Sequence, residues 1–132
     1  MIIKGTVKIT EKASIRFDAS TGIFFKIYSG DITLNDLETS WETIIEKKYI
    51  PEEVTGFILD YSNAKVKMDI SQTKGIAEFY NQHLQIFKEK KIGLIMTKPE
   101  QVIFPMLVES RNPPYYLKAF NTEHAAINWV IT

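Results

Sequence analysis

Segments with the pattern of β-strands alternate along this chain with segments of helical periodicity, and this alternation restricts the fold most. The strand-like segments are rich in β-branched and aromatic residues: 3–9, 15–17, 22–28, 55–60, 92–96 and 115–120. The helix-like segments have apolar residues three and four apart: 33–45, 69–91, 99–109 and 121–130. This order predicts an α/β fold with a single, mostly parallel sheet that helices cover, joined by right-handed crossovers. The turn-rich residues 18–22 add an N-terminal antiparallel hairpin.

The chain has the length and composition of one globular domain. It has 132 residues, of which 45% are hydrophobic and 24% charged, so we expect a single domain over residues 1–132. The N-terminus lacks the cationic and apolar regions of a signal peptide. The longest apolar run, residues 102–108, contains Pro105 and is too short to cross a bilayer. No transmembrane segment and a cytoplasmic location are therefore expected.

The charge balance and the missing residue types exclude several functions. Sixteen Lys and Arg offset sixteen Asp and Glu, which argues against nucleic-acid or membrane binding by bulk charge. The chain has no cysteine, and neither His83 nor His124 has a second histidine at metal-ligand spacing. Glycine-rich phosphate loops and nucleophile elbows are also absent. We therefore expect no cofactor, no metal and no enzymatic activity.

Three stretches together resemble the SpoIIAA-like STAS family. They are residues 30–33 (GDIT) with Asn35 and Asp36, residues 56–60 (GFILD), and residues 118–123 (KAFNTE) with Ala125, Ala126 and Trp129. The resemblance covers about residues 14 to 131 and implies the SpoIIAA-like β/α superhelix. The family includes bacterial anti-sigma-factor antagonists and a branch likened to Sec14-type lipid-binding domains, so it implies a regulatory, protein-binding role.

The regulatory motif of that family is Asp-Ser-Ser-Gly at the start of the second helix, where a partner kinase phosphorylates the second serine. The matching stretch here is Asp69-Ile70-Ser71-Gln72, in which Asp69 and Ser71 match the motif and Ile70 and Gln72 do not. The resemblance implies that Ser71 is a phosphorylation site, and a helix N-terminus would stabilise its phosphate. The alternative, which we favour, is that Ser71 only caps the helix or occupies its first turn.

Polar residues follow two of the predicted buried strands. Asp60, Ser62 and Asn63 follow residues 55–59, and Thr97 and Lys98 follow residues 92–96. Ligands of open α/β sheets bind at the carboxyl ends of the strands, so these side chains predict a polar crevice. The simpler interpretation is that Asp60 caps a loop or accepts backbone hydrogen bonds.

The third predicted helix is apolar on nearly every side. Phe104 and Leu107, with Met106 and Val108, either belong to the core or cover a binding surface for a partner or a lipid. Tyr115 and Tyr116 would lie at the rim of such a surface.

These observations lead to three hypotheses about function. The first is a non-catalytic regulatory or protein-interaction module that resembles a divergent STAS domain. The alternative is a carrier for a small apolar molecule or lipid, with a pocket under the third helix. The least favoured is an enzyme that uses Asp60. An edge strand from the N-terminal hairpin could also form a homodimer.

Overall fold

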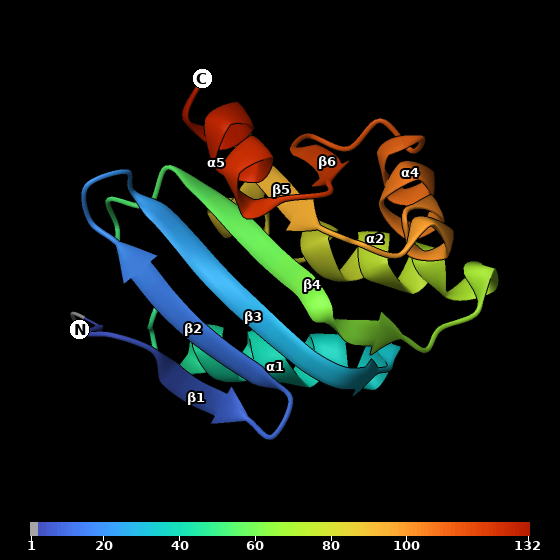
Figure 1. Cartoon of the computed structure of the whole chain (residues 1–132), viewed down its shortest axis with the longest axis horizontal. Helices are drawn as coiled ribbons and strands as arrows, with labels where there is room; N and C mark the ends of the chain where they lie inside the picture. The colour runs from blue at the N-terminus through green and yellow to red at the C-terminus, as the bar shows by residue number, and fades with distance from the viewer. Residues whose placement is uncertain (1–2) are drawn as a thin grey trace.

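The computed structural model describes residues 3–132, which form a six-stranded sheet with helices on both faces (Figure 1). The strands are β1 (Val7–Thr10), β2 (Ala13–Asp18), β3 (Ile23–Ile32), β4 (Gly56–Val66), β5 (Lys91–Ile95) and β6 (Tyr116–Phe120). Their order in the sheet is their order in the chain. Strands β1 to β3 pair antiparallel and β3 to β6 pair parallel. This confirms the predicted α/β sheet with its N-terminal antiparallel hairpin.

The helices form two layers around the sheet. They are α1 (Leu34–Glu46), α2 (Thr73–Asn81), α3 (Leu84–Phe87), α4 (Ile103–Glu109) and α5 (Glu123–Ile131), with 3-10 turns η1 (Ile70–Gln72) and η2 (Pro99–Gln101). Helices α1, α2 and α4 pack on one face, and α5 lies on the other, in front of β4 and β5 in Figure 1. Within residues 3–132, no helix has the length and hydropathy needed to cross a membrane.

The larger core lies between the sheet and the layer of α1, α2 and α4, and aromatic rings fill its centre. Trp41 of α1 is fully buried, and its ring centroid lies 6.0 Å from that of Phe57, 6.3 Å from Tyr80 and 5.2 Å from Phe87. All three pairs are edge-on, an arrangement that aromatic rings favour. A smaller core under α5 contains Ile23, Phe25, Ile58, Ile95, Ala126 and Val130.

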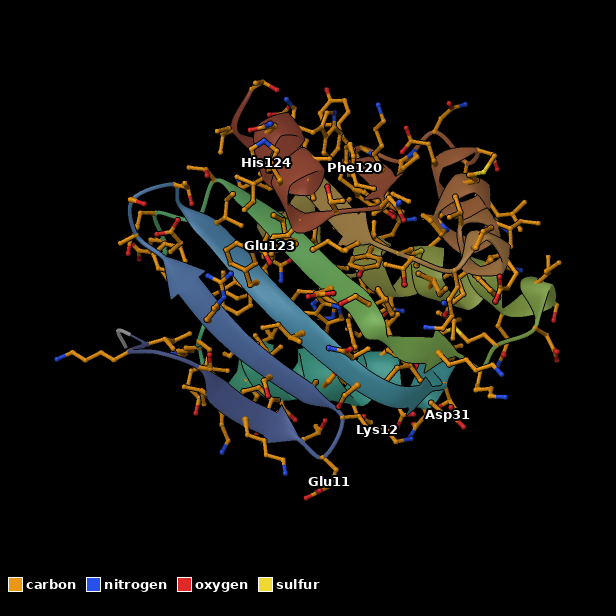
Figure 2. All side chains as sticks on the ribbon, viewed as in Figure 1. Glu11, Lys12, Asp31, Phe120, Glu123 and His124 are labelled. Carbon is orange, nitrogen blue, oxygen red and sulfur yellow. The ribbon has the colours of Figure 1, made fainter. Side chains whose placement is uncertain are left out.

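Helix α1 begins at the residue that the sequence predicts. The Thr33 hydroxyl accepts a hydrogen bond from the Asp36 backbone N–H at 3.1 Å, and the Asp36 carboxylate accepts one from the Thr33 N–H at 2.9 Å. This reciprocal pair is a capping box. Lys12 donates to the same Asp36 carboxylate at 3.1 Å and to the Asp31 carbonyl at 2.7 Å. The turn between β1 and β2 is thereby tied to the start of α1 (Figure 2).

Strand β4 is longer than predicted, so Asp60 does not end it. Between Asp60 and Asn63, β4 has one residue more than the facing stretch of β3 between Ile27 and Ser29. This extra residue forms a β-bulge, after which β4 pairs with β3 as far as Val66. The polar residues just after Asp60 resemble a loop, so the sequence did not predict the second half of the strand.

The helix predicted over residues 69–91 is instead three elements. The turn η1 precedes α2, α2 ends at Asn81, and His83 leaves helical geometry with φ −127° before α3. The break allows Phe87 to enter the core, where its ring centroid lies 4.8 Å from that of Tyr80. The sequence predicts Asn121 as the cap of the last helix, but the structure shows that Thr122 caps it, since the Thr122 hydroxyl accepts from the Ala125 N–H.

Candidate functional site

The segment that joins β4 to α2 presents the candidate regulatory residues together. We call residues 65–72 the α2 entry surface. Asp69 precedes the 3-10 turn, and Ile70 and Ser71 lie in it. The side chain of Ile70 is 55% exposed, and Ser71 is exposed as well. This turn therefore presents an apolar side chain and a hydroxyl side by side to solvent.

Hydrogen bonds of Asp69, Gln72 and Thr73 stabilise this turn, and the Ser71 hydroxyl takes no part in them. The Asp69 backbone N–H donates to the Gln72 side-chain oxygen at 2.9 Å, and the Gln72 N–H donates to the Asp69 carbonyl at 2.9 Å. The Thr73 hydroxyl donates to the Ile70 carbonyl at 2.7 Å. Among residues 3–132, no hydrogen bond to the Ser71 hydroxyl is found. Ser71 thus occupies the first turn without capping it.

Two lysines precede this turn in the chain and line a hollow beside it. An open hollow of about 390 Å³ is lined by Lys65, Val66, Lys67, Met68, Asp69 and Gln72. Lys65 and Lys67 are exposed on the last residues of β4 and just beyond it. In a chain with zero net charge, the α2 entry surface carries two positive charges against the one negative charge of Asp69. A ligand or partner that binds here would be favoured by negative charge.

The polar group around Asp60 is a local backbone structure. One Asp60 carboxylate oxygen accepts from the Ser62 N–H at 2.9 Å and from the Ser62 hydroxyl at 2.6 Å. The two residues therefore stabilise the β4 bulge, which agrees with the simpler interpretation of Asp60 as an acceptor of backbone hydrogen bonds. Asp60 lines neither the hollow described above nor the cavity under α4.

The end of β4 lies beside the loop that follows β5. The Lys98 ammonium donates to the Ala64 carbonyl at 3.1 Å, and Gln101 accepts from the Val66 N–H at 2.5 Å. Asn63 and Thr97 are exposed in these two segments. The two segments therefore lie side by side, and their contacts are made by Lys98, which was expected at this edge, and by Gln101, which was not.

The cavity under α4 is small. It holds about 30 Å³ and is lined by Leu37, Tyr61, Val66, Met68, Ile76, Tyr80, Leu94, Met96, Phe104, Pro105, Val108 and Leu117. Phe104 therefore lines it as predicted, whereas Leu107 does not. A cavity that binds benzene has about 150 Å³. A lipid chain would need α4 to move away from the sheet.

A second hollow runs along the edge strand β6. It holds about 460 Å³ and is lined by Val102, Pro105, Met106, Glu109, Tyr116, Leu117, Lys118, Ala119 and Trp129. Met106 is 64% exposed and Tyr116 is 55% exposed, whereas Tyr115 is buried. The Glu109 carboxylate accepts from the outward-facing Leu117 N–H at 3.1 Å. Glu109 therefore blocks part of this edge against pairing with another strand.

The histidines are not assembled into a metal site. His83 packs its ring on Phe79 at 4.7 Å, and His124 contacts the Asn128 side chain at 3.2 Å in α5 (Figure 2). Over residues 3–132, no group of three or more His, Cys, Asp or Glu side chains is placed to hold a metal ion.

The sequence did not predict two features of the α2 entry surface. Lys65 lies in the unrecognised second half of β4 and Lys67 just beyond it. The sequence placed Ile70 on the apolar stripe of the predicted helix and noted it as a departure from the regulatory motif, whereas the structure leaves it 55% exposed. The alternation of Lys65, Val66, Lys67 and Met68 was the available indication of a continuing strand.

Comparisons with known proteins support a conclusion about the fold of this chain. No protein-family model matches the sequence, and no curated protein matches it. Among solved structures, the chain is similar to an uncharacterized protein from the DUF3478 family with a SpoIIAA-like fold, from Shewanella loihica PV-4. The TM-score is 0.60 at 14% identity, with 98% of each chain covered.

The chain is also similar to the anti-sigma factor antagonist SpoIIAA in its unphosphorylated form. That comparison has a TM-score of 0.46 at 14% identity and covers 89% of this chain and 96% of the other. The order of strands and helices and the full-length match to the Shewanella structure lead to one conclusion: this chain has the SpoIIAA-like α/β fold.

Proposed function

We propose that this protein is a non-catalytic regulatory module of the cytoplasm that binds a protein partner through its α2 entry surface. The observation that carries the proposal is the exposed turn η1, where Ile70 and the free hydroxyl of Ser71 lie beside a lysine-lined hollow. Protein interfaces combine apolar contacts with a charged rim, and this turn offers both within a few residues.

Phosphorylation of Ser71 would change this surface strongly. A phosphate adds about −1.5 to −2 charges at neutral pH. That is enough to reverse the net positive charge that Lys65 and Lys67 give the surface. The start of α2 would stabilise the phosphate. Lys65 and Lys67 line the same hollow as Asp69 and Gln72, the residues before and after the Ile70-Ser71 pair, so we expect them to attract it. The proposal thus includes a switch in which the unmodified and modified forms differ in partner affinity.

The first prediction concerns capture of a partner from the source cell by immobilised wild-type and variant chains. Ile70→Asp introduces a charge in place of an exposed apolar contact, and we expect it to reduce recovery of the partner at least about tenfold, the effect of roughly 1.4 kcal/mol. Ser71→Asp should reduce recovery as well, whereas Ser71→Ala should retain it. Quantitative mass spectrometry of the eluates measures these ratios.

The matched control is Met106→Asp, which places the same charge on an apolar residue of α4 that is 64% exposed, against 55% for Ile70. The proposal requires that this variant bind the partner as wild type does. Equal losses with Ile70→Asp and Met106→Asp, or no loss with either, would contradict binding through the α2 entry surface. Loss with Met106→Asp alone would assign the interaction to the hollow beside β6.

The carrier hypothesis stays a prediction. It would require α4 to move, because the cavity beneath it holds only about 30 Å³. Native mass spectrometry of the gently purified protein tests it, since a bound apolar molecule would add its mass to that of the chain.

A further inference from the structure

A lysine lies in the larger core, where a charged side chain is not expected. Lys26 is 0% exposed and stands in the middle of β3. Side chains alternate along a strand, so Phe24, Lys26 and Tyr28 all point toward α1. Lysine is almost never fully buried in proteins unless it is paired with an acid.

The Lys26 amine has one hydrogen-bond acceptor and two aromatic faces around it. It donates to the Ser40 hydroxyl oxygen at 2.5 Å, and the Ser40 hydroxyl donates in turn to the Leu37 carbonyl at 3.0 Å. The nitrogen lies 4.2 Å from the centroid of the Trp41 ring and 4.5 Å from that of Tyr28. Ser40, Leu37 and Trp41 all belong to α1, so this helix forms the lid over the amine.

No carboxylate compensates a charge at this position. The ion pairs found within residues 3–132 all involve other basic side chains. The titratable groups that face the amine are phenols: Tyr28 on β3, Tyr61 of β4 stacked on it at 4.4 Å, and Tyr80 of α2 beside Trp41. The charged side chains of the packed elements are at least partly exposed and form no hydrogen bond with it: Asp36, Glu38, Glu42 and Glu46 on α1, Asp60 and Lys65 on β4, and Lys74 and Glu78 on α2. On β2 the residue opposite Lys26 is the buried Ile15. Every group that surrounds the amine is therefore neutral.

The surroundings disfavour an ammonium group. Burial lowers the pKa of Lys26 well below its ordinary value. The two aromatic rings stabilise a cation and offset part of this cost, but they do not replace a lost hydration shell. A neutral amine needs no such compensation and still donates its hydrogen bond to Ser40.

We propose that the native fold holds Lys26 as a free amine, and that proton uptake by this amine is linked to release of α1 from the sheet. Water reaches the amine only when Ser40 and Trp41 move away with α1. The effect extends to the partner-binding side, because Leu34 at the start of α1 lies 2.8 Å from the position that a Cβ on Gly75 of α2 would take. The packing of α1, and through it the position of α2, thus responds to pH.

The direction of the pH dependence follows from the proton balance. The unfolded chain binds a proton at Lys26 below about pH 10.4, whereas the native chain does not until its lowered pKa is reached. Unfolding in this window takes up a proton, so the unfolding equilibrium constant rises about tenfold for each unit that the pH falls. Lys26 therefore contributes most stability at alkaline pH and loses it as the pH falls toward neutral.

At higher pH the buried tyrosines have the opposite effect: they make the stability of the protein fall as the pH rises. Burial raises the pKa of Tyr28 and of Tyr80 well above the ordinary value. Above about pH 10 these phenols ionise in the unfolded chain but not in the native one, so stability falls. The wild-type protein should accordingly be most stable near about pH 10.

The test compares unfolding of wild type, Lys26→Met and the surface control Lys4→Met at several values between about pH 7 and pH 10. Lys26→Met removes the amine at similar length, and we expect it to be more stable than wild type at neutral pH. At pH values above the lowered pKa of Lys26, the difference in equilibrium constant should shrink by about tenfold per unit as the pH rises toward about 10. Lys4→Met, at an exposed site, should follow wild type throughout. Parallel curves for wild type and Lys26→Met would overturn the proposal.

A direct measurement on the wild-type chain tests whether Lys26 is a free amine, even if the methionine variant does not fold. Side-chain NMR of the Lys26 Nζ and Cε nuclei reports the protonation state. We expect the signals of a neutral amine at about pH 9, a pH at which an ordinary lysine is charged. An ammonium signal that persists to about pH 10 would overturn the proposal.

Discussion

Replacing Trp41 by alanine is expected to lower the unfolding free energy by about 3–5 kcal/mol. Trp41 is fully buried at the centre of the larger core and contacts the rings of Phe57, Tyr80 and Phe87. The truncation removes all three contacts and leaves a cavity that these rings cannot fill. Urea unfolding followed by circular dichroism measures the loss without relying on tryptophan fluorescence.

The matched control is Trp129→Ala in α5. Trp129 is only half-buried, and it contacts Phe120 at a centroid distance of 5.5 Å. We expect this variant to lose less than half as much stability as Trp41→Ala. Equal losses at the two positions, or a loss below about 1 kcal/mol at Trp41, would contradict the placement of the core between the sheet and α1.

Replacing Gly56 by alanine is expected to destabilise the protein by about 1–3 kcal/mol, because α5 lies too close to β4 for a side chain there. A Cβ on Gly56 would lie 2.5 Å from a Val130 methyl carbon and 3.1 Å from the Lys91 carbonyl oxygen. Either α5 or β5 must shift to admit it. Thermal or urea unfolding of the variant measures this effect.

The double variant Gly56→Ala with Val130→Ala provides the control for this contact. Removing the Val130 methyl groups opens space for the new Cβ, so the double variant should be more stable than the sum of the two single losses predicts. Additive losses would show that α5 does not limit the side chain at position 56. Gly93, where a Cβ would lie 3.4 Å from Val130, should tolerate alanine better than Gly56 does.

The general architecture followed from the sequence because its signals are local. The apolar periodicity after Thr33 and the turn at residues 18–22 each act within a few residues. Alternating strands and helices then leave few topologies open. These features suffice to predict a parallel sheet with an antiparallel N-terminal addition.

The differences arose where contacts distant in sequence decide the structure. The β4 bulge depends on pairing with β3, and the break at His83 depends on the place that the core offers to Phe87. Neither partner is visible in a local pattern. In both cases the apolar periodicity was real but did not show where the element ended.

The candidate site was predictable only in part. The positions of Asp69 and Ser71 at the start of a helix could be expected, whereas Lys65 lies in the unpredicted extension of β4 and Lys67 directly after it. Lys26 carried one indication, since it occupies an inward position between Phe24 and Tyr28. Composition alone places a lysine at the surface. Only the packing of α1 over this position shows that its amine is enclosed.

Site-specific photo-crosslinking in the source cell tests the central claim most directly. A photoreactive residue replaces Ile70 in one chain and Met106 in another, two exposed positions on different surfaces. If the protein binds a partner through its α2 entry surface, position 70 should yield a discrete crosslinked protein, and position 106 should not. A crosslink at position 106 with none at position 70 would contradict the account.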